Sequence, residues 1–219
     1  MNRFAIALLA GVAGVSVMSS AFAADLIISE PAPAVGVVST TGNWDGLFLG
    51  AFAGYGWGTV TDEDGYIDPA GTDFDTTGWQ LGVAAGANFT VSEAIVAGLV
   101  ADIAWSDISG TSPAGLESKT DWQGSVRGRL GFDGGAFLPY VTGGLAFANN
   151  TLTDGAIEDT QTHIGWTLGA GVEFAVADNV SLDLQYRYSD FGKKTYDLGG
   201  PQDFSLTSHA VTAGINFRF

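Results

Sequence analysis

The sequence predicts an all-β fold, an eight-stranded antiparallel transmembrane β-barrel that follows a cleaved signal peptide. Bulky apolar residues alternate with small or polar residues at a period of two in eight separate stretches, as in strands that have two different faces. The charged residues of these stretches fall on the phase opposite to the apolar one. Short and long connections between these stretches also alternate along the chain, which is typical of barrels that cross a membrane.

Composition excludes several classes of protein. Of 219 residues, 46% are hydrophobic and only 15% are charged, so the chain holds enough apolar surface to avoid disorder. The 24 acidic residues outnumber the 8 basic ones, for a net charge of −16, which argues against binding to nucleic acid because phosphate contacts need clustered Lys and Arg. The absence of cysteine excludes disulfides and thiolate metal sites.

The first residues have the features of an export signal. Arg3 precedes an uncharged apolar run from residue 4 to residue 18, and Ala21-Phe22-Ala23 matches a small-x-small cleavage site. The run is too short to span a bilayer as a helix, which takes about 20 residues. We therefore expect a signal peptide over residues 1–23, an extended periplasmic lead over residues 24–42, and a barrel over residues 43–219.

The eight alternating stretches are long enough to cross a bilayer with tilt. They are residues 47–59, 77–89, 95–105, 121–132, 138–148, 163–174, 180–188 and 208–219. The fifth is apolar on both phases, so its orientation cannot be assigned. Three connections are short, and four are long and polar, over residues 61–76, 106–120, 149–162 and 189–207. We expect the long connections to be loops that face outward, with both ends of the barrel chain on the short-turn side.

Aromatic residues lie near both ends of the apolar phase, as in proteins that cross a membrane interface. The girdles that we predict consist of Trp57, Trp79, Trp105, Trp122 and Trp166 at the long-loop end, and Phe89, Phe132, Phe174 and Phe217 at the other. A soluble sandwich or lipocalin-like barrel is the alternative, with its apolar phase turned inward. It is disfavoured because the apolar phase carries no charged residue and the opposite phase is rich in small residues.

The charged residues of the strands are predicted to face the lumen, since Arg or Lys facing lipid would cost about 2–4 kcal/mol at the bilayer midplane. We expect a paired network of Asp102, Arg127, Arg129, Glu173, Asp183, Arg187 and Arg218, with Asp121 also inward near the outer rim. An alternative is that these residues only solvate a narrow water column. An eight-stranded barrel is filled by its own side chains, so a wide channel is not expected.

Other candidate sites are weaker. Asp62, Glu63 and Asp64 begin an acidic stretch that could bind a divalent cation, but their spacing matches no EF-hand loop, and a solvated surface is the simpler interpretation. His163 and His209, near the strand ends, are the residues that catalysis or haem ligation would need. No catalytic motif accompanies them, so we predict neither an enzyme nor a bound cofactor.

Several stretches resemble the RopB-type family of small immunogenic, opacity-like surface barrels of Gram-negative bacteria. The matching segments are Trp44-Asp45-Gly46 with residues 54–58, and residues 122–131, 139–144, 165–171, 186–188, 190–192 and 215–219. They cover nearly the whole chain after residue 43. The ending Arg218-Phe219 departs mildly from the family's usual Lys-Phe.

The resemblance implies a place in the cell outer membrane and a role in envelope integrity, with exposed loops for contact with a host or the environment. Partners would be outer-membrane lipids and lipopolysaccharide, a host or envelope component, and the barrel-assembly machinery, for which Phe219 looks like the signal. A narrow porin for solutes or ions and a haemin-binding surface protein remain the alternatives.

Overall fold

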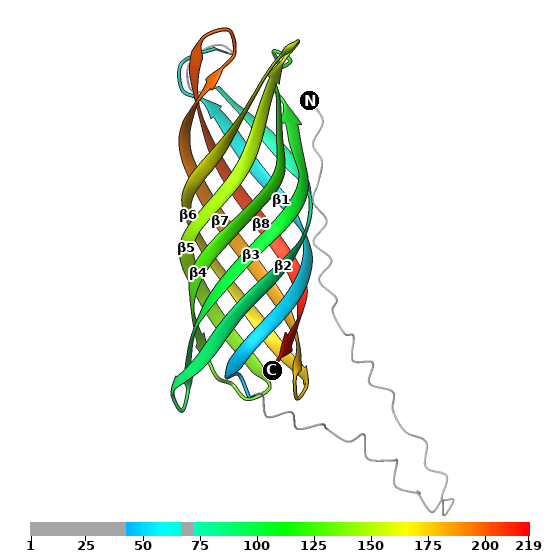
Figure 1. The fold of residues 1–219 in the computed structure, drawn as a ribbon, viewed down its shortest axis with the longest axis vertical. Helices are drawn as coiled ribbons and strands as arrows, with labels where there is room; N and C mark the ends of the chain where they lie inside the picture. Colours follow the sequence, from blue (N-terminus) through cyan, green and yellow to red (C-terminus); the bar gives the residue numbers. More distant parts are fainter. Residues whose placement is uncertain (1–42, 67–71) are drawn as a thin grey trace, which may run out of the picture. The chain divides into compact units, whose positions relative to one another are not determined.

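The computed structural model describes residues 43–66 and 72–219, so the predicted signal peptide and lead lie outside the described residues. Eight strands are joined in sequence order into a closed antiparallel ring (Figure 1). They are β1 Gly46–Asp62, β2 Thr72–Ser92, β3 Ile95–Thr111, β4 Glu117–Phe132, β5 Phe137–Asp154, β6 Ile157–Ala177, β7 Val180–Asp197 and β8 Pro201–Arg218. The prediction of an eight-stranded antiparallel barrel is confirmed. In the described part of the chain, no helix has the length and apolar character that crossing a membrane requires.

Apolar side chains face outward around the inner half of the barrel. Leu99 is 63% exposed, and Leu184 is likewise exposed on the opposite wall. The fifth strand, which the sequence left unphased, follows the same rule: Val141 and Leu145 point outward, whereas Leu138 is buried. A surface of this kind is stable in lipid and not in water, because apolar area is removed from water only when acyl chains cover it.

The connections at the outer end are far shorter than the sequence suggested. The four segments expected to be long loops are mostly strand, and the residues between strands are only 63–71, 112–116, 155–156 and 198–200. Gly155 and Gly199 have φ values of +60° and +85°, which suit the tight turns of the hairpins that they close. The strands continue instead of ending near the tryptophans.

The pattern of burial reverses in this outer extension. Beyond the tryptophans, apolar side chains point inward and form a cluster that we call the outer core, which includes Val60, Phe74, Leu116, Leu152, Phe191, Tyr196, Leu198, Phe204 and Leu206. The opposite phase carries exposed polar residues such as Asp75, Asp107, Thr111, Glu117 and Lys119. The extension therefore has the pattern of a water-soluble β protein. In these segments single apolar residues alternate with Thr and Asp, so their composition is that of a polar loop. For this reason the sequence analysis predicted that the strands end earlier than they do.

The ring of backbone pairing is also incomplete in this extension. Strands β5 and β6 pair up to Asp154 and Ile157, but β6 and β7 pair only as far as Trp166 and Asp190. Pairing of β2 with β3 likewise ends at Thr77. Beyond these points side-chain contacts join the strands, such as the hydrogen bond from the backbone N–H of Asp197 on β7 to the carboxylate of Asp159 on β6 at 2.8 Å. Figure 1 shows the tips of the β5–β6 and β7–β8 hairpins at the upper end of the barrel.

The inner end is closed by short turns and by the residues just before β1. The backbone N–H of Phe219 donates to the carbonyl of Leu47 at 2.9 Å, which places both ends of the barrel chain at this rim. Trp44 is buried against Val96 and Leu138, and its indole N–H donates to Asp133 in the β4–β5 turn at 3.2 Å. Trp44 thus covers the inner end of the lumen.

Candidate functional site

A carboxylate bound by two arginines occupies the middle of the lumen. Asp102 on β3 accepts from Nη2 of Arg127 on β4 at 2.7 Å and from Nη1 of Arg187 on β7 at 2.9 Å. The Ser125 hydroxyl donates to the same carboxylate at 2.5 Å. All three charged side chains are buried, because each lies on the inward phase of its strand. We call Asp102, Arg127 and Arg187 the lumen triad.

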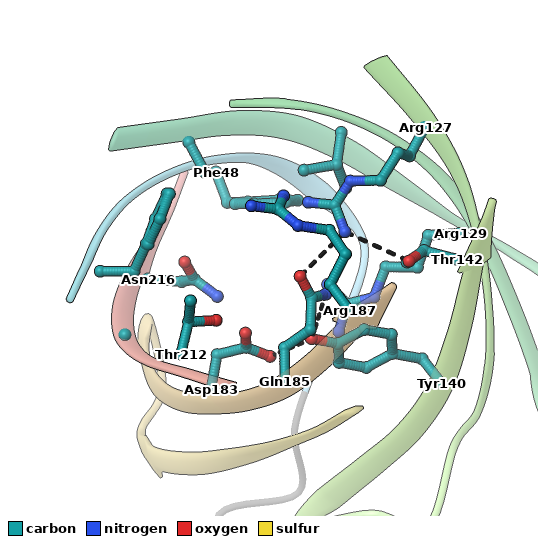
Figure 2. A pocket seen from close by; sticks show the side chains of 14 residues that line it. Phe48, Arg127, Arg129, Tyr140, Thr142, Asp183, Gln185, Arg187, Thr212 and Asn216 are labelled. Atoms are coloured by element: carbon teal, nitrogen blue, oxygen red, sulfur yellow. Dashed lines mark hydrogen bonds between the residues drawn. The ribbon is translucent and has the colours of Figure 1, made fainter. Parts of the chain in front are cut away.

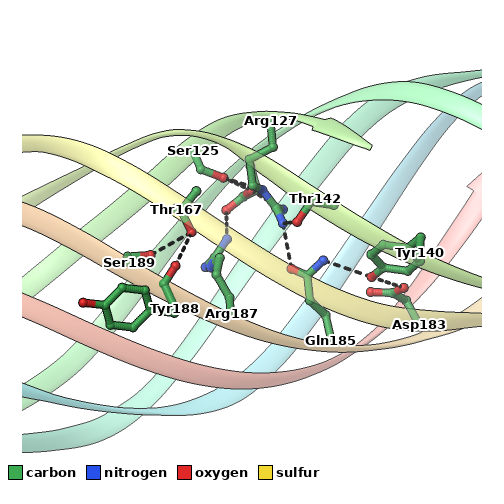
Figure 3. A network of polar contacts seen from close by, with 11 residues as sticks. Ser125, Arg127, Tyr140, Thr142, Thr167, Asp183, Gln185, Arg187, Tyr188 and Ser189 are labelled. Atoms are coloured by element: carbon green, nitrogen blue, oxygen red, sulfur yellow. Dashed lines mark hydrogen bonds and ion pairs between the residues drawn. The ribbon is translucent and has the colours of Figure 1, made fainter. Parts of the chain in front are cut away.

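Neutral polar side chains extend the triad toward the inner end (Figure 3). Arg127 Nη1 donates to Gln185 at 2.9 Å, and the Gln185 amide donates to the Tyr140 hydroxyl at 2.9 Å. Tyr140 in turn donates to Asp183 at 2.6 Å. The sequence analysis did not select Tyr140 or Gln185. Gln185 stood on the lumen phase of its strand, whereas Tyr140 lies on the fifth strand, whose phase could not be assigned.

A second ion pair lies nearer the inner end. Arg129 Nη2 donates to Glu173 Oε2 at 2.5 Å, and the Ser181 hydroxyl donates to the other carboxylate oxygen. The Arg129 guanidinium also stacks over the Tyr140 ring, 3.8 Å from its centroid. Buried charges are tolerated when they are paired and hydrogen-bonded in this way. The pair and the triad together place a polar, ordered layer across the inner half of the barrel.

Three predicted residues depart from this pairing. Asp183 has no basic side chain within ion-pair distance among the described residues, and it accepts from the Tyr140 hydroxyl. Arg218 is buried above Trp44, 4.4 Å from its ring, and none of its guanidinium nitrogens has a hydrogen-bond partner among the described residues. Asp121 is outside the barrel and not in the lumen. A register shift between Thr120 and Trp122 turns it outward, where it pairs with Lys119 at 3.2 Å.

The lumen is nearly filled. One cavity of ≈ 40 Å³ lies between the triad and the inner ion pair, and Figure 2 shows the side chains that line it. Farther out, Gln123 donates to Gln80 at 2.6 Å across the lumen, and beyond this contact the outer core begins. The Gln80–Gln123 contact and the outer core therefore narrow the lumen above this cavity.

The two histidines lie on opposite sides of the barrel wall. His163 is buried and shares a hydrogen bond of 2.7 Å with the hydroxyl of Tyr196 in the lumen. His209 stacks on Trp57 outside, with ring centroids 5.7 Å apart, and its Nδ1 is 2.7 Å from the Tyr186 hydroxyl. The structure does not bring these imidazoles together, and Asp190 contacts neither within the described residues; its carboxylate instead accepts from Gly192 N–H at 2.9 Å.

The acidic residues of the first hairpin have partners within that hairpin and on β7 and β8. Asp62 accepts from the backbone N–H of Gly65 at 3.0 Å, Glu63 pairs with Lys193 at 3.3 Å, and Asp64 accepts from the backbone of Asp203 at 2.9 Å. Among residues 43–66 and 72–219, no cluster of three or more His, Asp or Glu side chains could hold a metal ion.

One residue of this hairpin also fixes the tip of another. The Tyr66 hydroxyl donates to the carboxylate of Asp154 and, at 3.3 Å, to the carbonyl of Leu198. The hydrogen bond to Asp154 raises the pKa of Tyr66, and partial burial and the negative charge of Asp154 act in the same direction. Tyr66 therefore joins the tips of three hairpins as long as it is protonated.

The aromatic residues of the predicted girdles lie on the outside of the barrel. Trp57, Trp79, Trp105 and Trp166 are exposed and Trp122 is half-buried, while Phe89, Phe132, Phe174 and Phe217 are exposed toward the short-turn end. The tryptophans stand at the level where the pattern of burial reverses. This is the level at which an interfacial side chain with an apolar ring and a polar N–H is most stable.

A closed barrel that is apolar outside and charged inside defines a transmembrane β-barrel protein of the bacterial outer membrane. The family described as "Outer membrane protein beta-barrel domain" matches residues 7–219, and the chain belongs to this family. It is 35% identical over 204 residues to the 25 kDa outer-membrane immunogenic protein of Brucella abortus biovar 1, covering 92% of each chain.

Two further comparisons agree with this assignment. The chain is 36% identical to the 22 kDa outer membrane protein of Rhizobium leguminosarum bv. viciae over 183 residues, which are 83% of this chain and 81% of that one. The crystal structure of Neisserial surface protein A has the same fold, with a TM-score of 0.53 at 19% identity, over 79% of this chain and 97% of that one. The resemblance drawn from the sequence and the outer-membrane location are confirmed.

Proposed function

We propose that the protein is a non-conducting structural barrel that supports the integrity of the outer membrane and presents a rigid polar surface outside it. The observation that carries the proposal is the double closure of the lumen. The triad and the inner ion pair fill the inner half, and the outer core fills the extension. A solute could cross the barrel only by disrupting both layers. Ion pairs and hydrogen bonds stabilise the inner layer, and apolar packing stabilises the outer core.

The outer extension supports the second part of the proposal. Its outward phase is made of hydroxyl and carboxylate side chains held on paired strands, such as Ser109 on β3, Thr153 on β5 and Glu158 on β6. Because the connections between strands are short, this surface keeps one shape. The curated relatives named as immunogenic proteins are consistent with such a surface being accessible outside the cell.

Conductance of the purified protein in planar lipid bilayers tests the closed lumen. We expect no discrete current steps from the wild type. We expect none from a double variant, Arg127→Ser with Arg187→Ser, because the outer core still closes the extension. The shift in gel mobility between unheated and heated samples shows that each preparation is folded. Current steps of constant size from the folded wild type would overturn the proposal in favour of a narrow porin.

Complementation of a deletion strain tests the role in the envelope. We expect cells that lack the protein to become more sensitive to detergent, and the wild-type gene to restore resistance. A variant with Glu117→Gln and Glu158→Gln changes only the outward surface, so it should restore resistance as well. Unchanged detergent resistance in the deletion strain would contradict the structural role.

A further inference from the structure

We propose that the outer wall of the barrel along β3 and β4 binds one lipid that has a sugar as its headgroup. Two grooves lie on this wall, an apolar groove on the inner side of the paired residues Trp105 and Trp122 and a polar groove on their outer side. An acyl chain would lie in the first and the sugar in the second. The inference deepens the proposed function, because it gives the polar outer surface a ligand.

The apolar groove lies on the face of the barrel that contacts lipid, and its volume is ≈ 450 Å³. Leu49 on β1 and Val126 on β4 form its sides. Ala85 on β2 and Ala101 on β3 form its floor, and the four residues are consecutive partners across the strands. An acyl chain in this groove has contacts on its sides as well as beneath it, which adds dispersion attraction that a flat wall does not offer.

The polar groove begins where the wall leaves the membrane, and its volume is ≈ 460 Å³. Sites for small organic ligands usually have volumes of about 300–1,000 Å³. Hydroxyl and charged side chains of β3 to β6 line the groove, and the hydroxyls are those of Ser109, Thr111, Ser118, Thr151 and Thr153. A hydroxyl both donates and accepts hydrogen bonds, as the hydroxyls of a sugar do, so the two surfaces are chemically complementary.

One strand runs through both grooves, and β4 lies beside it along this wall (Figure 1). The successive outward residues of β3 are Ala101 and Ile103 in the apolar groove, then Trp105 and Asp107, then Ser109 in the polar groove. From Ala101 to Ser109 the strand rises about 26 Å. With a tilt of about 40° this is about 20 Å across the membrane, which is the thickness of one leaflet with its headgroups. A molecule that fills both grooves is therefore apolar at one end and polar at the other, as a membrane lipid is and a soluble glycan is not.

The charges of the polar groove favour a sugar over a phosphate. Lys119 is the cation of this groove, and it is already paired with Asp121 at 3.2 Å and with Asp107 at 3.9 Å. Glu117 and Glu158 also line the groove and add negative charge. A lipid phosphate would be repelled by these carboxylates, whereas a neutral sugar is not and can donate its hydroxyls to them.

Trp105 and Asp121 are the residues that we expect to contact the sugar ring. Trp105 is 58% exposed, so its indole offers a flat apolar surface to the C–H groups of a sugar. Asp121 directly precedes Trp122, which is the cross-strand partner of Trp105. The register shift between Thr120 and Trp122 thus places an outward hydrogen-bond acceptor beside an aromatic surface, and a sugar ring needs both.

Competition between two lipids tests the proposal. The protein is reconstituted in phosphatidylcholine vesicles that contain equal amounts of digalactosyl diacylglycerol and phosphatidylglycerol, and it is then extracted into a polyoxyethylene detergent, which has no sugar. Native mass spectrometry counts the lipids that stay bound. We expect the wild type to retain the digalactosyl lipid over phosphatidylglycerol by about tenfold, which is the effect of one or two ordinary hydrogen bonds. The shift in gel mobility on heating shows that each sample is folded.

Two variants with matched controls locate the site. Trp105→Leu removes the aromatic surface and Ala101→Phe fills the apolar groove, so each should reduce retention of the digalactosyl lipid to that of phosphatidylglycerol. Trp57→Leu on β1 and Ala213→Phe on β8 make the same changes at outward residues that line neither groove, and both should behave as the wild type does. Equal retention of the two lipids by the wild type, or a preference for phosphatidylglycerol, would overturn the proposal, and so would wild-type retention by Trp105→Leu and Ala101→Phe. Conductance and detergent resistance are measured independently of lipid retention, so failure of this proposal is distinguishable from failure of the proposed function.

Discussion

Replacing Asp102 with asparagine tests how much of the barrel's stability depends on the lumen triad. The substitution keeps the size of the side chain and removes its negative charge. Arg127 and Arg187 would then face each other in the lumen without the carboxylate that both contact, at 2.7 and 2.9 Å. We expect the free energy of unfolding to fall, because two buried cations lose their shared partner.

The magnitude follows from the geometry. Each hydrogen bond to a charged partner contributes about 1.5–3 kcal/mol, and Asp102 accepts one from each arginine. The amide of the replacement can still accept one of them. The lost bond accounts for part of the cost, and the buried arginine left without a carboxylate adds to it, so we expect a total loss of about 3–5 kcal/mol, the range found when one partner of a buried ion pair is removed. Urea unfolding of the protein in lipid vesicles, followed by tryptophan fluorescence, measures this loss as a shift of the midpoint.

Asp121→Asn is the matched control, because it removes the same charge on the outside of the barrel. Asp121 is exposed and pairs with Lys119 at 3.2 Å, so we expect a change of about 1 kcal/mol or less. The double variant Asp102→Asn with Arg187→Gln should lose less than the sum of its single variants, since the two residues contact each other. If Asp102→Asn cost no more than Asp121→Asn, the triad would not be a stabilising element and the reasoning would be wrong.

Three further predictions concern the rest of the barrel. Leu152→Ala creates a cavity in the outer core, where this side chain is fully buried, and should lower the free energy of unfolding by about 2–5 kcal/mol in the same urea assay. Leu99→Arg places a cation in lipid and should cost about 2–4 kcal/mol, whereas Thr111→Arg faces water and should cost little; equal costs would refute the membrane boundary. The raised pKa of Tyr66 means that the folded state holds this proton more tightly, so its contribution to stability is complete below pH 10 and declines above it. Tyr66→Phe should remove that component of the pH dependence, which ultraviolet titration of the phenol follows independently.

The sequence was sufficient for the part of the barrel inside the membrane. There, one physical rule decides each position, because a lipid-facing side chain must be apolar and a charged one must turn inward. Leu99 and Trp79 on one phase and Arg127 and Glu173 on the other could therefore be placed without coordinates. The sequence did not assign an orientation to the fifth strand. In the structure its hydrogen-bond register with β4 and β6 determines which of its side chains face lipid and which face the lumen.

The contacts between those charges could not be predicted. Asp102 meets Arg187 across 85 positions of the sequence, and the alternation pattern reports the face of a residue but not its partner across the lumen. Asp121 was misplaced because a bulge between Thr120 and Trp122 shifts the register by one residue, which moves a side chain to the other face. Nothing in the local sequence marked that bulge. Trp44 was missed as the inner closure because it precedes the first alternating stretch.

The length of the strands explains why the outer extension exists as a separate structure. A tilted strand needs about 9–11 residues to cross the hydrocarbon core of a bilayer, yet β2 and β6 have 21 residues each and β4 has 16. The remaining residues must be stable in water, where an apolar exterior is unfavourable and an apolar interior is favourable. A single sheet that passes from lipid into water must therefore move its apolar side chains from the outer face to the inner face, and this change occurs at the level of the tryptophans.

The paired strands of the extension also determine what kind of surface the protein presents to its surroundings. Flexible loops adapt to a partner at an entropic cost, whereas side chains on paired strands are already ordered. In the extension, Thr151 on β5 and Thr160 on β6 lie side by side and share a hydrogen bond of 2.9 Å, so neighbouring strands present their hydroxyls as one surface. Recognition of this protein from outside the cell should therefore depend on the folded barrel and be lost with heat or urea, because a peptide cut from one strand lacks the neighbouring half of the surface.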